Sequence, residues 1–223
     1  MKSRTRRFVV VGLGHFGWWV ARSLHASGHE VLAIDIDGQR VDRAAGQVSV
    51  ALVGDATDAL FLHNTGAAGA DAAVVSTGTD LAAAILSVLA LKDLGITEIY
   101  VKVTSRRSAR ALDAFGVTET IFPEREAAHR LAHRIGSKTI LDYIPVAAGY
   151  SIQEIAIPDA WLGRSPAELQ LPRRHGIQIV AVFDLLSGTF LMIPDPDRKF
   201  TESDVAIVLG KDEVVAEILR KAG

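Results

Sequence analysis

The first half of the chain alternates short runs of apolar residues with longer segments in which apolar residues recur at helical spacing. The apolar runs, rich in β-branched residues, predict strands at residues 7–11, 30–34, 48–53, 72–76, 98–103 and 119–122. Helical spacing predicts helices at residues 14–27, about 39–46, 57–64, 80–94 and 105–115. Since neighbouring parallel strands need crossover connections, this alternation predicts an α/β fold, a doubly wound parallel sheet of six strands with both faces covered.

The pattern changes in the second half of the chain. A helix is predicted from Pro123 to about residue 140, and Pro145 predicts a boundary after it. Alternating polar and apolar positions then predict half-exposed strands at residues 150–157, 176–184, 190–193 and 204–209, and a closing helix at 211–221. The sequence thus predicts two domains: residues 1–142, ending in a linker helix over about 124–142, and residues 143–223, a smaller, mostly antiparallel α+β domain.

Composition narrows the range of functions. Of the 223 residues, 49% are hydrophobic and 22% are charged, which excludes a wholly disordered chain. The formal net charge of −2 argues against a nucleic-acid partner, because proteins that coat nucleic acid are strongly basic. The chain has no Cys, which excludes a disulfide framework, a thiolate metal site and a Cys nucleophile. No stretch approaches about 18 consecutive apolar residues, so no membrane span is predicted.

The segment GLGHFG at residues 12–17 is a GxGxxG motif between the first predicted strand and the first predicted helix. Glycines at these positions permit a tight turn, close approach of the backbone to phosphate, and close packing of the helix on the sheet. The helix N-terminus offers free N–H groups and a favourable dipole to a phosphate. Asp35, which ends the second strand, is placed to accept hydrogen bonds from both ribose hydroxyls of a nucleotide and disfavours a 2′-phosphate.

Other polar residues follow later strands at the same predicted edge of the sheet, where ligands of open α/β sheets bind. Asp55 is predicted either to contact an adenine-side group or to cap the next helix. The segment 76–78, Ser-Thr-Gly, either lines the crevice with hydroxyls and backbone or forms an ordinary turn. Glu124 opens the helix after the sixth strand, where it either complements the helix dipole or binds Mg²⁺ or a phosphate-side group.

Three further groups are weaker candidates. His129 and His133 have the i, i+4 spacing of metal ligands, but the sequence offers no third ligand, so a solvated or interface pair is favoured. The arginines at positions 106, 107 and 110 predict a solvated helix face. Trp18 and Trp19, beside the glycine motif, predict a core or subunit contact.

A catalytic arrangement is not recognisable in the sequence. A dehydrogenase needs an acid or base positioned at its substrate. The second domain has no convincing His/Asp or Tyr/Lys pair, and its one His is His175, beside a predicted turn. We therefore expect a protein that is not an enzyme. An NAD-dependent oxidoreductase and a stand-alone NAD or dinucleotide sensor are the alternative functions.

Several segments beyond the glycine motif resemble one family, in order, along nearly the whole chain. The segments GLGHFG, HEVLAIDID, GDAT and VKVTSRRSARALDAFGVTETIFPEREAA resemble the N-terminal half of RCK (KTN) domains, the regulators of potassium conductance. The segments YSIQEIAIP, HGIQIVAVF and DVAIVLGKDEVVAEI resemble the C-terminal half of the same domains. One copy of each half in 223 residues resembles the single-copy Ktr gating subunits rather than the doubled TrkA type.

The resemblance implies a Rossmann-type domain that dimerises and assembles into a homo-octameric ring in the cytoplasm. It also implies a membrane partner, a KtrB-like potassium-translocating subunit, which holds the ring at the inner face of the cell membrane. The implied nucleotides are ATP and ADP, which favour different ring shapes, with NAD as a further candidate. Some relatives bind cyclic di-AMP in the second domain through an Arg-x-x-Tyr-Gly segment, which here reads PRRHG at residues 172–176.

The resemblance also implies roles for individual residues. Asp35 and Asp37 lie at the sugar, Asp55 lies near the adenine, and Lys102 matches a lysine of the fifth strand. Glu124 matches a glutamate near the phosphates and a divalent cation, Mg²⁺, at the dimer interface. The predicted nucleotide-binding residues are Gly12, Gly14, His15, Phe16, Gly17, Asp35, Ile36, Asp37, Asp55, Ala56, Thr57, Thr77, Gly78, Lys102 and Glu124.

One of these residues departs from the family pattern. His15 stands where such subunits often carry Arg, and that arginine would bind the γ-phosphate of ATP. Histidine is shorter than arginine and only partly charged near neutral pH. The sequence therefore predicts adenine-nucleotide binding without predicting that ATP is discriminated from ADP.

Overall fold

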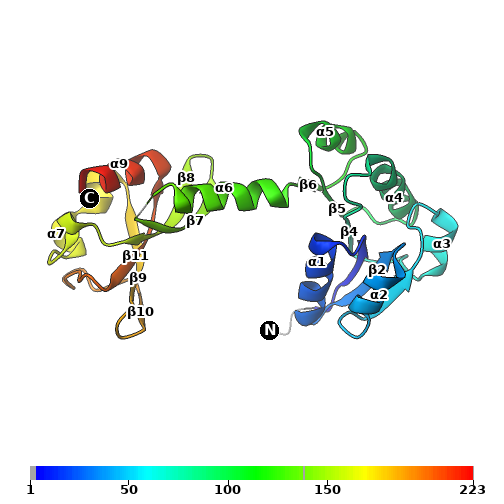
Figure 1. Cartoon of the computed structure of the whole chain (residues 1–223), viewed down its shortest axis with the longest axis horizontal. Helices are drawn as coiled ribbons and strands as arrows, with labels where there is room; N and C mark the ends of the chain where they lie inside the picture. Colours follow the sequence, from blue (N-terminus) through cyan, green and yellow to red (C-terminus); the bar gives the residue numbers. More distant parts are fainter. Residues whose placement is uncertain (1–3, 138, 223) are drawn as a thin grey trace. The chain divides into compact units, whose positions relative to one another are not determined.

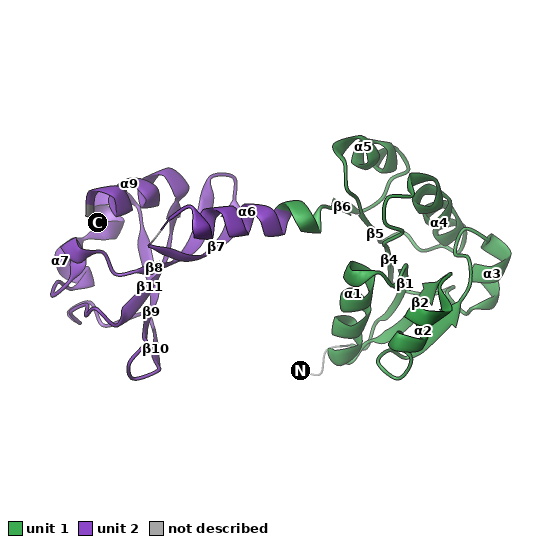
Figure 2. Ribbon diagram, viewed as in Figure 1, with its two compact units in different colours: residues 1–125 green, residues 126–223 purple. Residues whose placement is uncertain are grey.

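The computed structural model describes residues 4–137 and 139–222, which form two compact units within Met1–Arg125 and Glu126–Gly223 (Figure 2). In the first unit, six parallel strands follow the order β3-β2-β1-β4-β5-β6, which confirms the predicted doubly wound α/β fold (Figure 1). The strands are β1 (Arg7–Val11), β2 (Glu30–Asp35), β3 (Val50–Val53), β4 (Ala72–Val75), β5 (Ile99–Lys102) and β6 (Glu119–Ile121). The helices are α1 (His15–Ala26), α2 (Gly38–Ala44), α3 (Ala59–Asn64), α4 (Leu81–Asp93) and α5 (Arg106–Ala114).

Both faces of this parallel sheet are buried, which explains why its strands read as continuous apolar runs. Side chains alternate along β1, so Val10 joins a core cluster with α1 and α2, while Val9 and Val11 join a separate cluster with α3, α4 and α5. The three valines are at most 4% exposed. The helices that pack on the two faces therefore hold the carboxyl ends of the six parallel strands along one edge of the sheet.

Side-chain caps begin four helices of the first unit. Asp37, Asp58, Asp80 and Ser105 accept hydrogen bonds from backbone N–H groups in the first turns of α2, α3, α4 and α5. The cap of α3 is Asp58, and the helix starts at Ala59, later than predicted. The alternative in which Asp55 caps this helix is therefore wrong.

The second unit contains an antiparallel sheet with the order β10-β9-β11-β8-β7, which confirms the predicted α+β domain. Its core gathers Trp161 and Phe200 with aliphatic residues of the sheet and of α9. The strands are β7 (Ile140–Ala147), β8 (Tyr150–Ala156), β9 (Gln178–Asp184), β10 (Thr189–Met192) and β11 (Asp204–Lys211). The helices are α6 (Pro123–Ile135), which spans the boundary between the units, a 3₁₀ turn (Asp159–Trp161), α7 (Pro166–Leu169), α8 (Leu171–His175) and α9 (Asp212–Ala222).

Strand β7 is absent from the sequence prediction, which extended the helix to about residue 140 and placed a boundary at Pro145. The helix α6 ends earlier, at Ile135, and the Ser137 hydroxyl then accepts N–H groups of Thr139 and Ile140 at the start of β7. Pro145 lies inside β7, where the sheet tolerates it because β7 is an edge strand that pairs only with β8.

None of the helices within the described ranges combines the length and the apolar character that crossing a bilayer requires.

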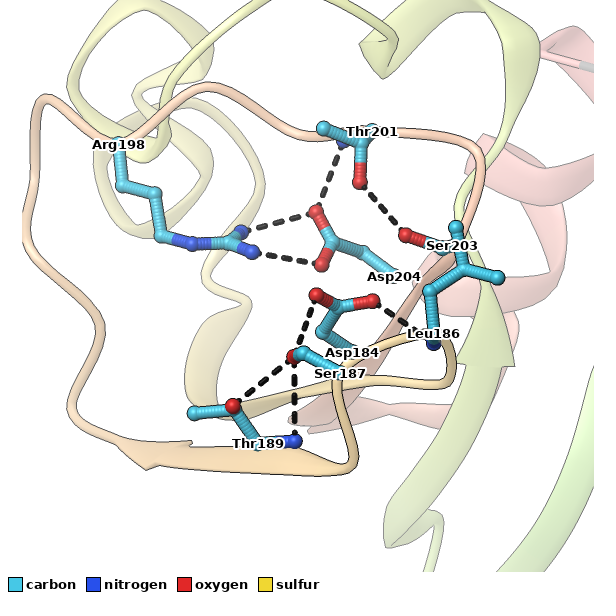
Figure 3. A network of polar contacts seen from close by, with 8 residues as sticks. All are labelled: Asp184, Leu186, Ser187, Thr189, Arg198, Thr201, Ser203 and Asp204. Carbon is cyan, nitrogen blue, oxygen red and sulfur yellow. Dashed lines mark hydrogen bonds and ion pairs between the residues drawn. The ribbon is translucent and has the colours of Figure 1, made fainter.

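A polar network holds the loop between β10 and β11 against the second sheet (Figure 3). The carboxylate of Asp204 is fully buried and receives both Nη groups of Arg198, at 2.7 and 2.8 Å, and the Thr201 N–H at 2.8 Å. Burial raises the pKa of Asp204, but the hydrogen bonds from Arg198 and Thr201 outweigh it and the net direction is downward. Nearby, the Ser187 hydroxyl and the Leu186 N–H lower the pKa of Asp184 to about 2.

We predict that Arg198→Met destabilises the second unit by about 3 kcal/mol, because the substitution leaves a buried carboxylate without its cation. Hydrogen exchange of β9 and β11 amides in increasing urea measures this change. Lys221→Met is the matched control: it removes an equivalent cation from the exposed pair with Glu217 and is expected to leave the free energy of unfolding nearly unchanged, because solvent screens exposed pairs. Equal effects of the two substitutions would contradict a stabilising role for the buried pair.

Candidate nucleotide-binding site

A cleft of about 770 Å³ runs along the carboxyl ends of the strands in the first unit. It crosses the point between β1 and β4 where the strand order reverses, the place at which open α/β sheets bind ligands. Every strand of the sheet contributes residues to it, from the strand end or from the segment that follows, which after β6 is the first turn of α6. All of the predicted site residues except Gly17 and Asp37 line this cleft.

The three glycines of the GxGxxG motif have three different surroundings. Gly12 has a φ of +87°, and a Cβ there would lie 2.2 Å from the Ser76 carbonyl oxygen. A Cβ on Gly17 would lie 1.8 Å from the Gly12 carbonyl oxygen, so this glycine lets α1 pack on the loop. At Gly14 the φ is −61° and a Cβ would meet no atom within 4 Å. The protein itself therefore does not require glycine at position 14, whereas a phosphate lying on the loop would.

Asp35 is the most deeply buried acid of the cleft, with 3% of its side chain exposed. One carboxylate oxygen accepts the Leu13 N–H at 2.5 Å, and the other accepts the Asp37 N–H at 2.9 Å. Arg40 approaches the same carboxylate at 3.4 Å. Since a carboxylate has about four acceptor positions, it can also accept a ribose hydroxyl.

The two predicted residues outside the cleft have structural positions. Gly17 lies within α1 and faces the glycine loop, as described above. Asp37 caps α2 by accepting the Gln39 N–H at 2.9 Å, and its carboxylate pairs with Arg40 at 3.3 Å. Asp37 does not line the cleft itself but contacts two residues that do, Asp35 through its backbone N–H and Arg40 through its carboxylate.

Asp55 and the turn after β4 form the cleft wall on either side of the glycine loop. The Asp55 carboxylate accepts the backbone N–H of Thr57 at 2.9 Å and its hydroxyl at 2.7 Å, which orders the Asp55–Thr57 turn. On the other side, the Thr77 hydroxyl donates to the Asp80 carbonyl at 3.1 Å, and Gly78 has a φ of +75°. The segment at 76–78 thus is both a turn and a part of the cleft lining.

Lys102 and Glu124 form an ion pair at the far end of the cleft, with Nζ 2.6 Å from Oε1. Lys102 ends β5 and is 14% exposed, while Glu124, in the first turn of α6, is 66% exposed. The hydrogen bond from Lys102 lowers the pKa of Glu124, and the residue's own backbone N–H lowers it further. A cation and an anion thus meet in the cleft lining, on residues at the end of β5 and after β6.

Several lining residues of the cleft were not predicted from the sequence, and two of them, Arg40 and Ser87, bear on its chemistry. Arg40 extends from α2 and pairs with both acids that follow β2. Ser87 on α4 is 1% exposed, and its hydroxyl has no hydrogen-bond partner in the part of the chain that the structure describes. The available signal was a hydroxyl residue within the otherwise apolar run of residues 81–91.

The weaker candidates stay apart from the cleft. The His133 ring stacks on Tyr143 at 4.0 Å, and across residues 4–137 and 139–222 no group of three His, Asp or Glu side chains is arranged to hold a metal. The three arginines of α5 are exposed, as predicted for a solvated face.

Residues 8–123 match the TrkA-N domain and residues 152–223 match the TrkA-C domain. The chain is 34% identical over 205 residues to Ktr system potassium uptake protein C of Bacillus subtilis (strain 168), covering 92% of each chain. It is 31% identical over 220 residues to Ktr system potassium uptake protein A of Vibrio alginolyticus, covering 99% of each chain.

A solved structure of the GsuK channel has a TM-score of 0.66 with this chain at 17% identity, covering 99% of this chain and 40% of the channel chain. At that identity the likeness concerns the fold alone.

Fold and cleft together define a Rossmann-type protein with a cleft at the topological switch point of its parallel sheet, and with a separate antiparallel α+β domain. With its TrkA-N and TrkA-C domains, the chain belongs to the RCK family and is homologous along almost its whole length to the Ktr potassium uptake proteins. This family is non-enzymatic, in agreement with the prediction from the sequence.

We predict that Gly14→Ala lowers the affinity for ADP at least about tenfold, because the added methyl group occupies the space of a phosphate, while the free energy of unfolding changes by less than about 1 kcal/mol. Calorimetric titration with ADP and urea unfolding measure the two quantities. Gly17→Ala is the contrasting variant, since its Cβ meets backbone and costs about 3 kcal/mol or more of stability. Unchanged ADP affinity in folded Gly14→Ala would place the ligand elsewhere.

We predict that Lys102→Met raises the pKa of Glu124 towards its ordinary value of 4.5, because the largest cause of its depression is removed. The stabilising contribution of the charged Glu124 is present above pH 4.5 and is lost as the pH falls through the depressed pKa, so the variant loses this pH dependence. A carbon-13 NMR titration of the Glu124 carboxyl measures the shift. Lys92→Met is the control, because Lys92 donates to the Gly116 carbonyl and does not line the cleft.

Proposed function

We propose that this chain is a cytosolic regulatory subunit that controls potassium uptake through a membrane partner in response to an adenine nucleotide. The observation that carries the proposal is the cleft at the switch point, where an open glycine at position 14 lies beside the buried carboxylate of Asp35. The similarity to two Ktr system potassium uptake proteins along almost the full chain supports the transport role.

The chemistry of the cleft wall determines how the proposed nucleotide is placed. A diphosphate lies on the glycine loop, where the N-terminus of α1 supplies N–H groups and its dipole. The ribose lies at Asp35 and the adenine lies towards Asp55, Ala56 and Thr57. ATP and ADP place further phosphates towards Lys102 and Glu124. NAD shares the adenosine diphosphate half, and the GsuK channel, a fold relative, has been solved with NAD bound.

A divalent cation fits this arrangement. Mg²⁺ binds through one or two carboxylates together with phosphate oxygens, and Glu124 is an exposed carboxylate at the phosphate end of the cleft. In this proposal Mg²⁺ screens the outer phosphates when it is bound. Lys102 and Glu124 keep complementary charges in place when it is not.

Regulation requires only that nucleotides bind two conformations with different affinity. A tenfold difference in affinity shifts the equilibrium by about 1.4 kcal/mol per site, and identical sites in one assembly add their shifts. Glu124 stands in the first turn of α6, the helix that leads from the first unit to the second. A nucleotide that changes the Lys102–Glu124 pair therefore acts on the connection between the two units.

The proposed assembly is a homodimer that forms a homo-octameric ring beneath a KtrB-like membrane subunit. Residues 1–142 serve as the nucleotide-binding domain with its linker helix. Residues 143–223 serve as the second domain, and cyclic di-AMP is the ligand proposed for it. The protein is then cytoplasmic and held peripherally at the membrane by its partner.

The test combines binding and transport with one variant. Asp35→Asn is expected to weaken ADP, ATP and NAD alike by about 10- to 100-fold, because hydrogen bonds from ribose to a charged acceptor contribute about 1.5–3 kcal/mol. With the membrane subunit in proteoliposomes, potassium flux should differ between ATP and ADP for the natural chain and become independent of the nucleotide for the variant.

Asp58→Asn is the matched control, since Asp58 caps α3 and does not line the cleft. Turnover of NADH by the natural chain, or flux that is insensitive to nucleotides, would overturn the proposal. Unchanged nucleotide affinity in Asp35→Asn would overturn the assignment of the cleft alone.

A further inference from the structure

A second cavity of about 430 Å³ lies between α1 and α2 on the outer side of the glycine loop. Its volume falls in the range of small-ligand pockets, about 300–1,000 Å³. The side chains that give it its chemistry are His15, Trp18, Trp19, Arg40, Arg43 and Gln47. We call this cavity the tryptophan groove. His15 and Arg40 also line the nucleotide cleft, so the two cavities adjoin.

The groove presents large aromatic surface to solvent. Trp19 is 56% exposed although it is a large apolar side chain, and Trp18 is only partly buried against the core of that face. The two indole rings meet edge to face with centroids 4.6 Å apart. The guanidinium of Arg22 lies over both rings, at 5.3 and 5.2 Å, which holds the pair in one arrangement. Held indoles of this kind are platforms on which planar rings stack.

The charge around the groove is positive. None of its lining residues is acidic. Arg43 makes only a long hydrogen bond of 3.4 Å to the Gln39 carbonyl, and among the described residues no carboxylate lies within 4.0 Å of its guanidinium or of that of Arg22. Arg40 is paired with Asp35 and Asp37 on its other side. Among the described residues, the groove thus offers one arginine without a carboxylate partner, Arg43, next to aromatic faces, with the paired Arg40 beside it.

We propose that the tryptophan groove is a second nucleotide site, distinct from the cleft, which binds a purine mononucleotide. The base stacks on Trp19, the phosphates bind Arg43 and Arg40, and Gln47 supplies an amide for the edge of the base. Aromatic stacking with cationic phosphate contacts is the common chemistry of nucleotide platforms. The site goes beyond the regulatory role proposed above and does not depend on it.

The experiment is calorimetric titration of the full chain with ADP, accompanied by tryptophan fluorescence. The natural chain is expected to bind two ADP per chain and to show quenching of Trp18 and Trp19, while Trp161 in the second unit serves as the internal reference. Trp19→Ala is expected to weaken the groove event at least about tenfold and to leave the cleft event unchanged. Arg43→Met is expected to do the same without altering the indoles.

Two comparisons separate this proposal from that for the cleft. Asp35→Asn should weaken only the cleft event, and Phe115→Ala, which truncates an exposed aromatic outside both cavities, should change neither. A single ADP per chain, or a second event that persists in both Trp19→Ala and Arg43→Met, would overturn the second site. Loss of both binding events in Asp35→Asn would show that the two cavities form one continuous site. If Trp19→Ala dissociated a dimer and bound as much ADP as the natural chain, the groove would instead be an interface with a second copy of the chain. A groove event without a cleft event would refute the cleft and leave the groove standing.

Discussion

The buried carboxylate of Asp35 is the contact on which the nucleotide cleft depends. It binds the Leu13 N–H of the glycine loop and the Asp37 N–H before α2, and so joins the ends of β1 and β2. A carboxylate so removed from water requires such donors. The same charge is the acceptor available to a ribose, so loop geometry and ligand recognition share one group. Because this group binds the loop, the glycine motif and Asp35, both within the first 40 residues, form one structural unit.

A second constraint is the close approach of backbones around the loop. The positions at which a Cβ would strike Ser76 or Gly12 bring the loop, β4 and α1 together without intervening side chains. The cleft floor at the loop is consequently made of peptide groups. Charged side chains surround it in two groups, which are Asp35, Arg40 and Asp55 at or after the ends of β2 and β3, and Asp80, Lys102 and Glu124 at or after the ends of β4, β5 and β6. The nucleotide proposed above has its sugar at the first group and its outer phosphates at the second.

The sequence predicted the parallel unit well, because strands buried on both faces produce long apolar runs and every strand end carries a polar signature. The prediction from the sequence failed where tertiary contacts determine the local structure. Strand β7 was missed because an edge strand accepts Pro145 and because five of its eight residues are exposed, which obscures the apolar pattern of a strand. The cap of α3 was misplaced because Asp55 and Asp58 are equally good caps in isolation. Arg40 and Ser87 enter the cleft from helices whose rotation about their axes the sequence leaves undetermined.

Arg40 connects the cleft and the tryptophan groove. Its guanidinium pairs with Asp35 and Asp37, and it lines both cavities. A ribose can bind Asp35 beside Arg40, because the carboxylate has further acceptor positions, so occupancy of the cleft does not require this ion pair to break. Any influence of one proposed site on the other that passes through Arg40 is reciprocal, with the same sign and size in both directions. The shared arginine therefore permits joint occupancy of the two proposed sites.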